Sequence, residues 1–476
     1  MAAVEALALA RVQFAFTVGA HIVFPALTIG LASFLVVLEA LLLRTGAERY
    51  RRLYQFWAKV FAVNFGMGVV SGLVMAYEFG TNWSRFSDFA GGITGPLLTY
   101  EVLTAFFLEA GFLGVMLFGW NRVGPYLHFA STVLVAIGTL VSATWILASN
   151  SWMQTPQGYA IVDGRAVPTD WIAVILNPSF PWRLLHMSLA AFLATALVVG
   201  AAGARLMLRG VDRPEVRTMT SMALWMLLLV APIQVLVGDA HGLNTLRYQP
   251  AKLAAIEGHW QNEPGQGVPL TLLGWPDMER ETTRFAVDVP HLSSLVLTHR
   301  WDGQFAGLKE FPKADRPNAT IVFWSFRLMV GLGFAMFALG LWSAWARLRG
   351  TLERSRPLLR TLAIMGPAGI VAMLAGWVTT EVGRQPWAVY GVLRTADAVS
   401  AHPAAAVGTS LALFVIVYVI VFGAGIYYLL RLLAQGPPGD ADTDGNVEGG
   451  PGRPRQALRP LSAAPDRLAD PGERGG

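Results

Sequence analysis

Hydrophobic residues along this chain gather into long runs, and short polar stretches separate most runs from the next. A helix needs about 20 apolar residues to cross a hydrocarbon core about 30 Å thick. Nine runs reach that length, at residues 12–43, 54–77, 95–119, 126–148, 183–208, 218–239, 320–346, 358–381 and 407–433. The pattern therefore predicts an all-α polytopic membrane protein with about nine transmembrane helices.

The polar residues divide the chain into four regions. Residues 1–239 hold the first six predicted helices, residues 240–319 form a polar segment of domain-like length, and residues 320–433 hold the last three helices. Residues 434–476 are rich in Gly, Pro, Asp and Arg and contain few large apolar side chains. Such a composition cannot bury enough apolar surface to fold, so this tail is predicted to be disordered.

The arginines predict the orientation of the helices. They cluster after the first, fifth and seventh predicted helices, whereas the short alternate loops hold few of them. Because short positively charged loops stay in the cytoplasm, we expect the N-terminus and the segment 240–319 outside and the tail in the cytoplasm. The N-terminus lacks the basic stretch and the small-residue cleavage site of a signal peptide, so the first run is interpreted as a retained helix.

Composition excludes several classes of protein. Of the 476 residues, 54% are hydrophobic and 14% are charged, whereas soluble domains carry about 25% charged residues. A soluble enzyme is therefore excluded. The absence of cysteine excludes disulfides, thiolate-bound iron–sulfur clusters and covalently attached c-type haem. The net charge of +5 does not indicate a nucleic-acid partner, because the arginines lie mostly in short loops between apolar runs.

Several side chains that can ligate iron are predicted to lie at membrane depth. At about 1.5 Å per residue, His21 and Met329 lie about 14 Å from the outer ends of their helices, His186 about 5 Å, and Glu381 at the outer end itself. Imidazole and thioether groups are axial ligands of haem iron, and intramembrane ionisable residues are functional candidates. The alternative is that each histidine is a hydrogen-bonded structural residue, as expected for His128, and that the methionine only packs.

Two carboxylates and two arginines add further candidates. Glu101 and Glu109 are about 12 Å apart along one helix and within about 80° of the same face, which suits a proton relay. Each could instead pair with an arginine or with another hydrogen-bond partner. Arg327 and Arg384, near the outer ends of their helices, could neutralise haem propionates or could act as interfacial anchors.

The polar segment contains the sequence Gln-Pro-Ala-Lys-Leu-Ala-Ala-Ile-Glu at residues 249–257. Lys252 and Glu257 could hydrogen-bond the oxygens of a quinol ring and accept its protons. Without further context the same pattern favours a short amphipathic helix on a loop.

Three stretches together resemble one known family. They are Phe-Trp-Ser-Phe-Arg-Leu-Met at 323–329, Gly-Trp-Val-Thr-Thr-Glu-Val-Gly-Arg-Gln-Pro-Trp at 376–387, and the stretch at 249–257. Over about residues 5–433 the chain resembles subunit I of the cytochrome bd-type quinol oxidases. The Gly-Arg-Gln-Pro-Trp run is specific, whereas the isolated histidines contribute only through their placement.

The resemblance implies three haems. His186 and Met329 would ligate a low-spin haem b, while His21 and Glu381 would serve two high-spin haems, one haem b and one haem d. Some relatives carry haem b in place of haem d, and these motifs do not separate the two kinds. Three more residues would lie near the haems, namely Arg11, Arg327 and Trp377, and Arg384 remains a candidate partner of a haem propionate.

The resemblance also implies the reaction. Ubiquinol or menaquinol would be oxidised at the outer face, at Lys252 and Glu257 of the quinol-binding loop 240–319. O2 would be reduced to water at the high-spin pair with protons from the cytoplasm, and Glu101 and Glu109 would be residues of the proton pathway or of a haem site. A proton gradient would arise by charge separation without pumping. The implied setting is a bacterial plasma membrane, with membrane lipid, a second oxidase subunit and, in some assemblies, a small single-helix subunit.

A second class of function competes with the oxidase. A proton- or ion-coupled transporter could use Glu101, Glu109 and His21 for its substrate. Transporters often contain inverted repeats and helices broken near mid-membrane, and no such repeat is evident here. A haem–copper oxidase is disfavoured because it needs several histidines on copper, whereas two of the eight histidines lie at haem-ligating depth.

Overall fold

The computed structural model describes residues 2–439, and the side chains from Glu5 onward. The predicted disordered tail, residues 434–476, lies outside the described residues except for 434–439. The first two of these six residues still belong to the last helix, which ends at Gln435.

Within the described residues, nine helical spans are long and apolar enough to cross a membrane, which confirms the number expected from the sequence. They are α1 (Ala2–Thr45), α2 (Glu48–Thr81), α3 (Ser84–Glu101) continued by the π-helical turn η1 (Val102–Phe106) and α4 (Phe107–Phe118), α5 (Pro125–Gln154), α7 (Phe180–Leu208), α8 (Pro214–Tyr248), α11 (Ala319–Leu348), α12 (Arg356–Ile364) with α13 (Ala368–Val382), and α15 (Ala404–Gln435).

Local sequence explains where several helices begin and end. Proline stands in the first turn of α5, α7, α8 and α12, where its fixed φ suits the helix and its missing N–H has no partner to lose. Asn318 caps α11 by accepting a hydrogen bond from the backbone N–H of Ile321 at 3.1 Å. Pro250 disfavours the helical conformation at Gln249, so α8 ends there and the short helix α9 (Pro250–Glu257) begins.

Several helices continue beyond their apolar runs. α1 begins ten residues before the run at 12–43, and α8 continues nine residues past the run that ends at 239. Hydropathy identifies only the part of a helix that contacts lipid. The helix itself can continue through polar residues where other elements of the protein pack against it. These polar helical ends carry part of the candidate site.

Small residues let the central helices approach closely. A Cβ on Gly369 of α13 would lie only 2.5 Å from the Cα of Ala194 of α7, and one on Gly30 of α1 would lie 2.8 Å from the carbonyl oxygen of Ala191. Glycine and alanine at such contacts allow backbone-to-backbone packing in membranes. α7 is thereby packed against both α1 and α13.

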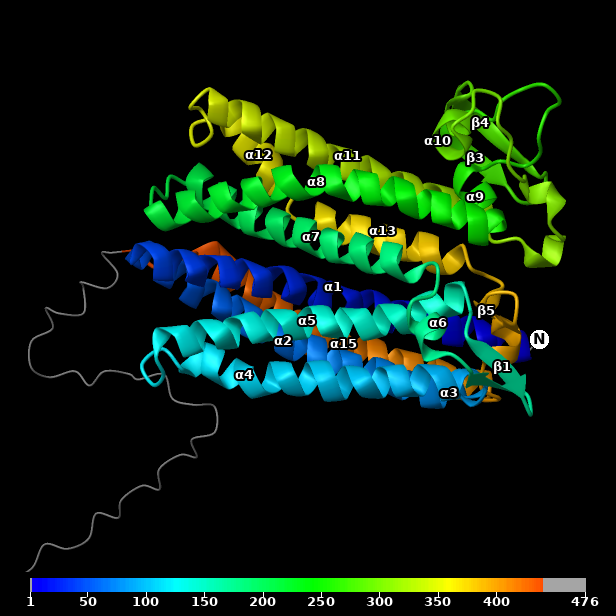
Figure 1. Cartoon of the computed structure of the whole chain (residues 1–476), viewed down its shortest axis with the longest axis horizontal. Coiled ribbons are helices and arrows are strands. Elements are labelled where there is room, and N and C mark those ends of the chain that lie inside the picture. The colour runs from blue at the N-terminus through cyan, green and yellow to red at the C-terminus, as the bar shows by residue number, and fades with distance from the viewer. Residues whose placement is uncertain (1, 440–476) are drawn as a thin grey trace, which may run out of the picture. The chain divides into compact units, whose positions relative to one another are not determined.

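The connections at one end of the bundle are the more elaborate. Figure 1 shows this end with the N-terminus, and we call it the N-terminal end. It carries three antiparallel hairpins, β1–β2 (Tyr159–Val162, Arg165–Pro168), β3–β4 (Leu270–Asp277, Thr282–Val289) and β5–β6 (Trp387–Val389, Leu393–Arg394). It also carries the short helices α6 (Trp171–Ile175), α9, α10 (Leu292–Thr298), η2 (Leu308–Glu310), η3 (Lys313–Asp315) and α14 (Thr395–Ala398).

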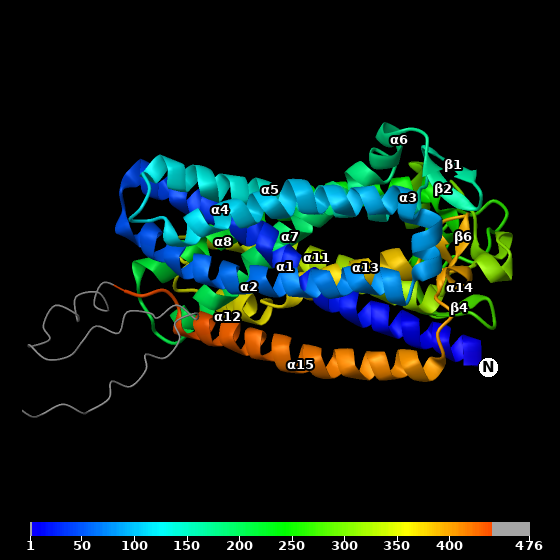
Figure 2. The ribbon, with the colours of Figure 1, turned by 90° about the horizontal axis from the view of Figure 1, so that it is seen from below.

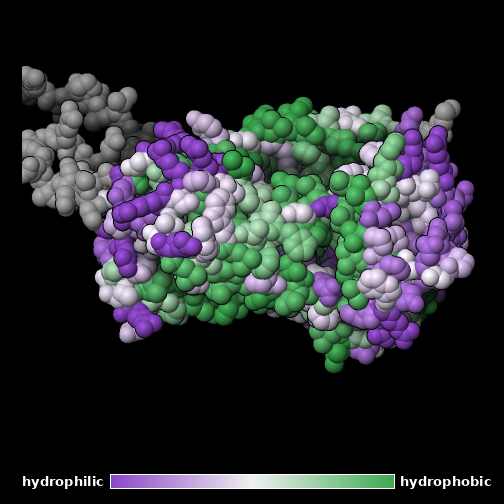
Figure 3. Space-filling view, turned by 90° about the horizontal axis from the view of Figure 1, so that it is seen from above, coloured by the Kyte–Doolittle hydropathy of each residue, from purple (hydrophilic) through white to green (hydrophobic). Residues whose placement is uncertain are grey.

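Two polar ends enclose an apolar band. Figure 3 shows hydrophobic side chains over the middle of the helices and hydrophilic ones at both ends, as a bilayer-spanning protein requires. α15 runs along one side of the bundle (Figure 2), and most of its large apolar side chains are exposed. The end opposite the N-terminus holds the connections with the arginine clusters, and we call it the arginine-rich end.

Candidate functional site

The ring of His21 on α1 is held in one tautomer by α2. Its Nδ1 lies 2.9 Å from Ser71 Oγ, and that hydroxyl donates its own proton to the carbonyl oxygen of Met67 or Gly68. Ser71 can therefore only accept from His21, so Nδ1 carries the ring proton and Nε2 keeps its lone pair. A metal-ligating histidine has this arrangement, with one nitrogen fixed by a neighbour and the other available.

His186 on α7 has a ring nitrogen without a partner. Its Nδ1 is buried and accepts or donates no hydrogen bond within the described part of the chain. The ring faces α8, where a Cβ on Gly238 would lie 3.5 Å from Cε1 and where the ring of His241 packs edge-on at a centroid distance of 5.6 Å. Because leaving a buried polar atom unpaired is costly, a group outside this chain is expected to satisfy it.

Helix α13 carries the candidate residues Trp377 and Glu381 and contacts a third, Met329. The thioether of Met329 on α11 points at Gly376, where a Cβ would lie 2.7 Å from Sδ. The next residue, Trp377, reaches α1 and lies 3.9 Å from the position of a Cβ on Gly19. Glu381 follows one turn later. Glycine at 376 is therefore what admits the methionine sulfur beside the other two candidates.

The carboxylate of Glu381 is fixed by α5 and by its own helix end. Asn150 Nδ2 donates to Oε1 at 2.9 Å, and Gln154 Nε2 donates to the same oxygen at 3.3 Å. Arg384 forms an ion pair with Oε2. The carboxylate is thus oriented by neighbours on two elements.

Gln154 also joins Glu381 to the polar segment. Its Oε1 accepts a hydrogen bond from Lys252 Nζ at 2.6 Å, and Gln249 Oε1 accepts one from the same nitrogen at 2.7 Å. The Lys252 side chain is buried, and this burial, together with the nearby Arg183, lowers the pKa of Lys252 well below its usual value. Lys252 therefore belongs to the same hydrogen-bond network as Glu381.

Positive charge exceeds negative charge around this network. Two buried arginines, Arg183 of α7 and Arg384, interact electrostatically with the single carboxylate of Glu381. Arg183 is buried, and its Nε has no hydrogen-bond partner among the described residues. Because buried charges require counter-charges, the surplus fits an anionic group such as a cofactor carboxylate.

Glu257 faces away from Lys252, because five helical residues turn through about 140°. Ser293 Oγ donates to Glu257 Oε2 at 2.9 Å, and Arg327 Nη2 lies 3.8 Å from the same oxygen. Burial raises the pKa of Glu257, while Arg327 and Ser293 partly oppose that rise. Residues 251–257 are all buried, so α9 is not the surface amphipathic helix that the sequence alone also allowed.

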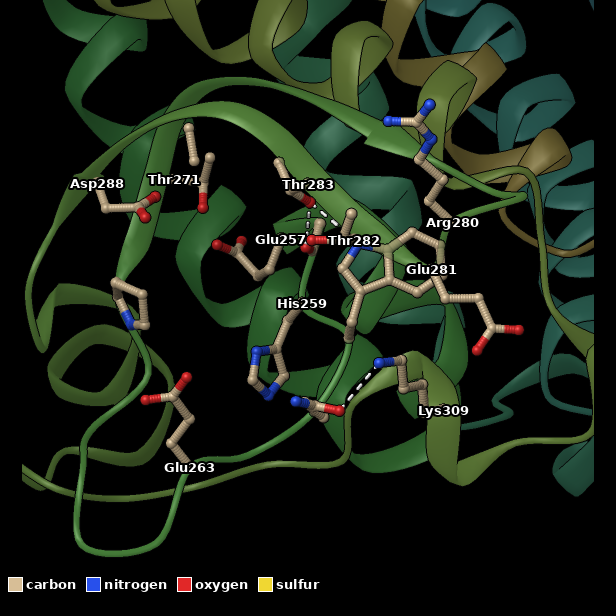
Figure 4. Close-up of a pocket in the computed structure, with 15 residues that line it drawn as sticks. Glu257, His259, Glu263, Thr271, Arg280, Glu281, Thr282, Thr283, Asp288 and Lys309 are labelled. Carbon is tan, nitrogen blue, oxygen red and sulfur yellow. Dashed lines mark hydrogen bonds between the residues drawn. The ribbon is translucent and has the colours of Figure 1, made fainter.

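A polar pocket of about 280 Å³ opens at Glu257. Figure 4 shows Glu257 and His259 near its centre, with Glu263, Thr271 and Asp288 around them. Burial lowers the pKa of His259. The pocket therefore places a chain of ionisable and hydroxyl side chains next to a carboxylate that is otherwise enclosed.

Arg327 ties α11 to the polar segment. Its guanidinium donates to the carbonyl oxygen of Thr271 at 2.6 Å and to that of Ile256, and it lies 3.7 Å from the ring centroid of Phe323. These are the contacts of an anchor. Arg11, in contrast, is exposed on α1.

Glu101 and Glu109 both face α5 because of the π-helical turn between them. Ser142 Oγ donates to Glu101 Oε1 at 2.7 Å, and a Cβ on Gly138 would lie 2.6 Å from Glu109 Cγ. An uninterrupted α-helix would leave the two about 80° apart. The wider turn η1 takes up one extra residue. This rotates Glu109 back by about 100° around the helix axis, so that about 20° separates the two carboxylates. Both carboxylates thus lie along one stripe of α5.

Several residues of this site were not predicted from the sequence, among them Asn150, Gln154, Arg183 and His241. Gln154 and His241 lie on helical ends beyond the apolar runs, and Arg183 stands at the predicted membrane surface, where arginine is common. A usable signal was the spacing of Asn150 and Gln154, which places both amides on one face if the helix continues past residue 148.

The arrangement fits haem better than a bare metal ion. In the part of the chain that the structure describes, no three His, Cys, Asp or Glu side chains converge as a metal-ion site. Haem needs only one or two axial ligands from the protein, and single imidazole and thioether groups here face glycines. The surplus of buried positive charge suits its propionates. These features define a membrane-embedded haem oxidoreductase.

The family can be stated more narrowly. The sequence model described as "Cytochrome bd terminal oxidase subunit I" matches residues 9–437, and the chain belongs to this family.

Relatives and a solved structure agree. "Cytochrome bd-II ubiquinol oxidase subunit 1" of Escherichia coli (strain K12) is 32% identical over 90% of this chain and 96% of that protein. "Cytochrome bd ubiquinol oxidase subunit 1" of Bacillus subtilis (strain 168) is 33% identical over 92% of this chain and 96% of that protein. "The structure of bd oxidase from Geobacillus thermodenitrificans" matches with a TM-score of 0.85 and 27% identity, over 92% of this chain and 100% of that one.

Membership confirms the broad expectations from the sequence. The chain is a subunit of a respiratory quinol oxidase, a multi-pass protein of a bacterial plasma membrane that uses haem, quinol and O2 and works with a partner subunit. The alternative of an ion-coupled transporter is set aside.

The close approach at Gly376 gives a first testable prediction. In Gly376→Ala, the new Cβ would meet Met329 Sδ at 2.7 Å, so the flexible thioether must shift while the helices stay in place. Because the resemblance implies that Met329 ligates a low-spin haem b, we expect the midpoint potential of that haem to change by about 60 mV or more, which is about tenfold in a one-electron equilibrium. Redox titration of the purified oxidase measures it. Gly331→Ala on α11 has open space and should leave the potential unchanged; an equal shift in both variants would contradict the prediction.

Proposed function

We propose that this chain oxidises quinol at α9 and holds three haems beneath it. His186 and Met329 would hold a low-spin haem b, and His21 and Glu381 would serve a high-spin pair of haem b with haem d, or with haem b in its place. The observation that carries the proposal is the hydrogen-bonded link Lys252–Gln154–Glu381. It joins the polar segment directly to one of the expected iron ligands, so the sites of electron entry and of O2 reduction would be neighbours.

The bound haems supply one-electron transfer and an iron at which O2 is reduced. The chain's own residues bind, orient and move protons. Arg183 and Arg384 would neutralise propionates, and Ser71 keeps the His21 Nε2 lone pair available.

Quinol oxidation releases protons, and Glu257 is placed to accept them. Burial raises its pKa, so it binds a proton more readily than an exposed carboxylate does, and the polar pocket at His259 and Asp288 leads toward solvent. The N-terminal end, which carries the pocket, would face outward, because the arginine clusters lie at the opposite end. The protons would therefore leave on the outer side.

O2 reduction consumes protons, and Glu101 and Glu109 are placed to deliver them. Both carboxylates face one stripe of α5. The end of the same helix carries Asn150 and Gln154, which hydrogen-bond Glu381. Protons taken from the cytoplasm and protons released outside would together charge the membrane without a pump. Ubiquinol and menaquinol are the proposed substrates. A second subunit with, in some assemblies, a small single-helix subunit would complete the enzyme.

The relay gives the test of this function. In proteoliposomes supplied with quinol, the wild-type oxidase should consume O2 and build a membrane potential that is positive on the side of quinol oxidation. Glu109→Gln should slow both by at least about tenfold, because a positioned proton-transfer group contributes about 10²–10⁴-fold. Quinol should still reduce the haems of the variant.

The matched control is Glu48→Gln, an exposed carboxylate at the arginine-rich end, which should keep the wild-type rate. Full turnover in Glu109→Gln would remove this residue from the proton route. A potential of the opposite sign would overturn the proposed orientation.

A further inference from the structure

The hairpin β3–β4 exposes an apolar face. Trp275 and Phe285 are 53% and 81% exposed, and Leu273 and Val287 are each 53% exposed. Leu273 and Val287 are cross-strand partners. Gly274 and Pro276, which alternate with these residues, are buried. One side of β3 therefore packs on the protein, and the hairpin presents large apolar side chains from both strands outward.

Hydrogen bonds fix the hairpin beside the first turns of α11. Thr320 Oγ1 donates to the carbonyl oxygen of Pro276 at 2.6 Å. The Arg327 guanidinium, which lies over the Phe323 ring, donates to the carbonyl oxygen of Thr271 at 2.6 Å. Strand β3 thus runs alongside α11 from the level of Thr320 to about that of Phe323. Figure 1 likewise shows β3 and β4 beside the helix ends at the rim of the bundle.

That level is where the membrane boundary is expected. α11 belongs to a candidate membrane span, and Ile321, Trp324 and Leu328 are exposed along it. Tryptophan is enriched where a span meets the headgroups, so Trp324 marks the interface. The apolar face of the hairpin lies at the same level and continues the exposed apolar surface of the helix.

We propose that the outward face of β3–β4 dips into the bilayer, at the boundary between headgroups and acyl chains. The occupant is lipid, because the face lies beside the exposed apolar side chains of the membrane-spanning helix α11 and has the aromatic and aliphatic composition of an interfacial anchor. The hairpin would hold the polar segment against the membrane surface, so that the Glu257 pocket stays level with the layer in which a lipid-soluble substrate travels.

The absence of cysteine from this chain makes the test direct. Phe285→Cys is introduced into the complete oxidase, spin-labelled and reconstituted in lipid nanodiscs. Accessibility is measured to O2, which concentrates in lipid, and to a water-soluble nickel chelate. Leu328→Cys on α11 is the lipid-facing reference. Thr282→Cys, exposed at the turn of the same hairpin, is the aqueous reference. Labelled wild-type oxidase gives the background from the partner subunit.

We expect the label at 285 to collide with O2 severalfold more often than the label at 282 does, and to match the label at 328. Preferential access of the nickel chelate would show that the face lies in water. Exclusion of both probes would show that another protein covers it. Either result would overturn the proposal without touching the proposed oxidase function, because the accessibility of the label does not depend on turnover.

Discussion

Met329→Leu is expected to lower quinol-dependent O2 consumption by at least about tenfold while the helix bundle stays folded. Leucine replaces methionine at nearly equal volume, a swap that costs less than about 1.5 kcal/mol in a packed site. The thioether that faces Gly376 is lost, however. A methionine ligand raises the potential of a haem, so its loss lowers the potential. Each fall of about 59 mV makes a one-electron reduction tenfold less favourable.

Met336→Leu is the matched control, because it makes the same change two turns further along α11 at a side chain buried in the apolar core. Reduced-minus-oxidised spectra and redox titration of both variants separate ligation from packing. Only Met329→Leu should lose or shift the low-spin absorbance. A wild-type spectrum and potential in that variant would exclude Met329 as a ligand, whatever the rate of turnover.

The membrane architecture could be predicted from the sequence because the hydrophobic effect is non-directional and additive over the residues of a run. About 20 apolar residues are needed to span a bilayer, and a run of that length can be recognised from the sequence without knowing which helices pack together. The same reasoning makes His21 a candidate, since an ionisable side chain inside an apolar run is visible by contrast with its neighbours. Met329 is apolar like its surroundings, and only the resemblance of its stretch to a known family gives it a role.

The network around Glu381 could not be predicted in this way. Gln154 and His241 lie on polar helical ends, where hydropathy falls although the helix continues. The π-helical turn between Glu101 and Glu109 leaves no trace in hydropathy either, because it changes the backbone hydrogen-bond spacing. These features depend on which helices pack together, and that information becomes available only with the tertiary structure.

The segment 249–257 shows how the sequence and the structure differ in what they say of two neighbouring residues. The sequence pairs Lys252 with Glu257 as two groups for the same quinol, whereas the structure directs them to opposite sides of α9. Lys252 bonds to Gln154 and Gln249, and Glu257 bonds to Ser293 beside Arg327. We therefore expect different defects on their replacement, and the larger effect on proton release at Glu257.

Glu257→Gln is expected to reduce kcat for quinol oxidation by about 10²–10⁴-fold, the usual contribution of a positioned general base. Burial raises the pKa of Glu257 above its ordinary value. Below that raised pKa the carboxyl group is protonated and cannot accept a proton from quinol. The wild-type rate should therefore fall as the pH is lowered through this pKa and level off above it, and glutamine should remove this acid limb.

Steady-state rates with a water-dispersible quinol across the pH range measure both effects, and Glu279→Gln, an exposed carboxylate on the β3–β4 turn, is the control. An artificial donor that delivers electrons without protons should restore O2 consumption in Glu257→Gln, because only the proton acceptor is missing. If the variant stays slow with that donor, Glu257 acts on electron transfer or folding instead. If it keeps the wild-type rate and acid limb with quinol, the proton acceptor must be another group, of which Asp288 and His259 in the same pocket are the nearest candidates.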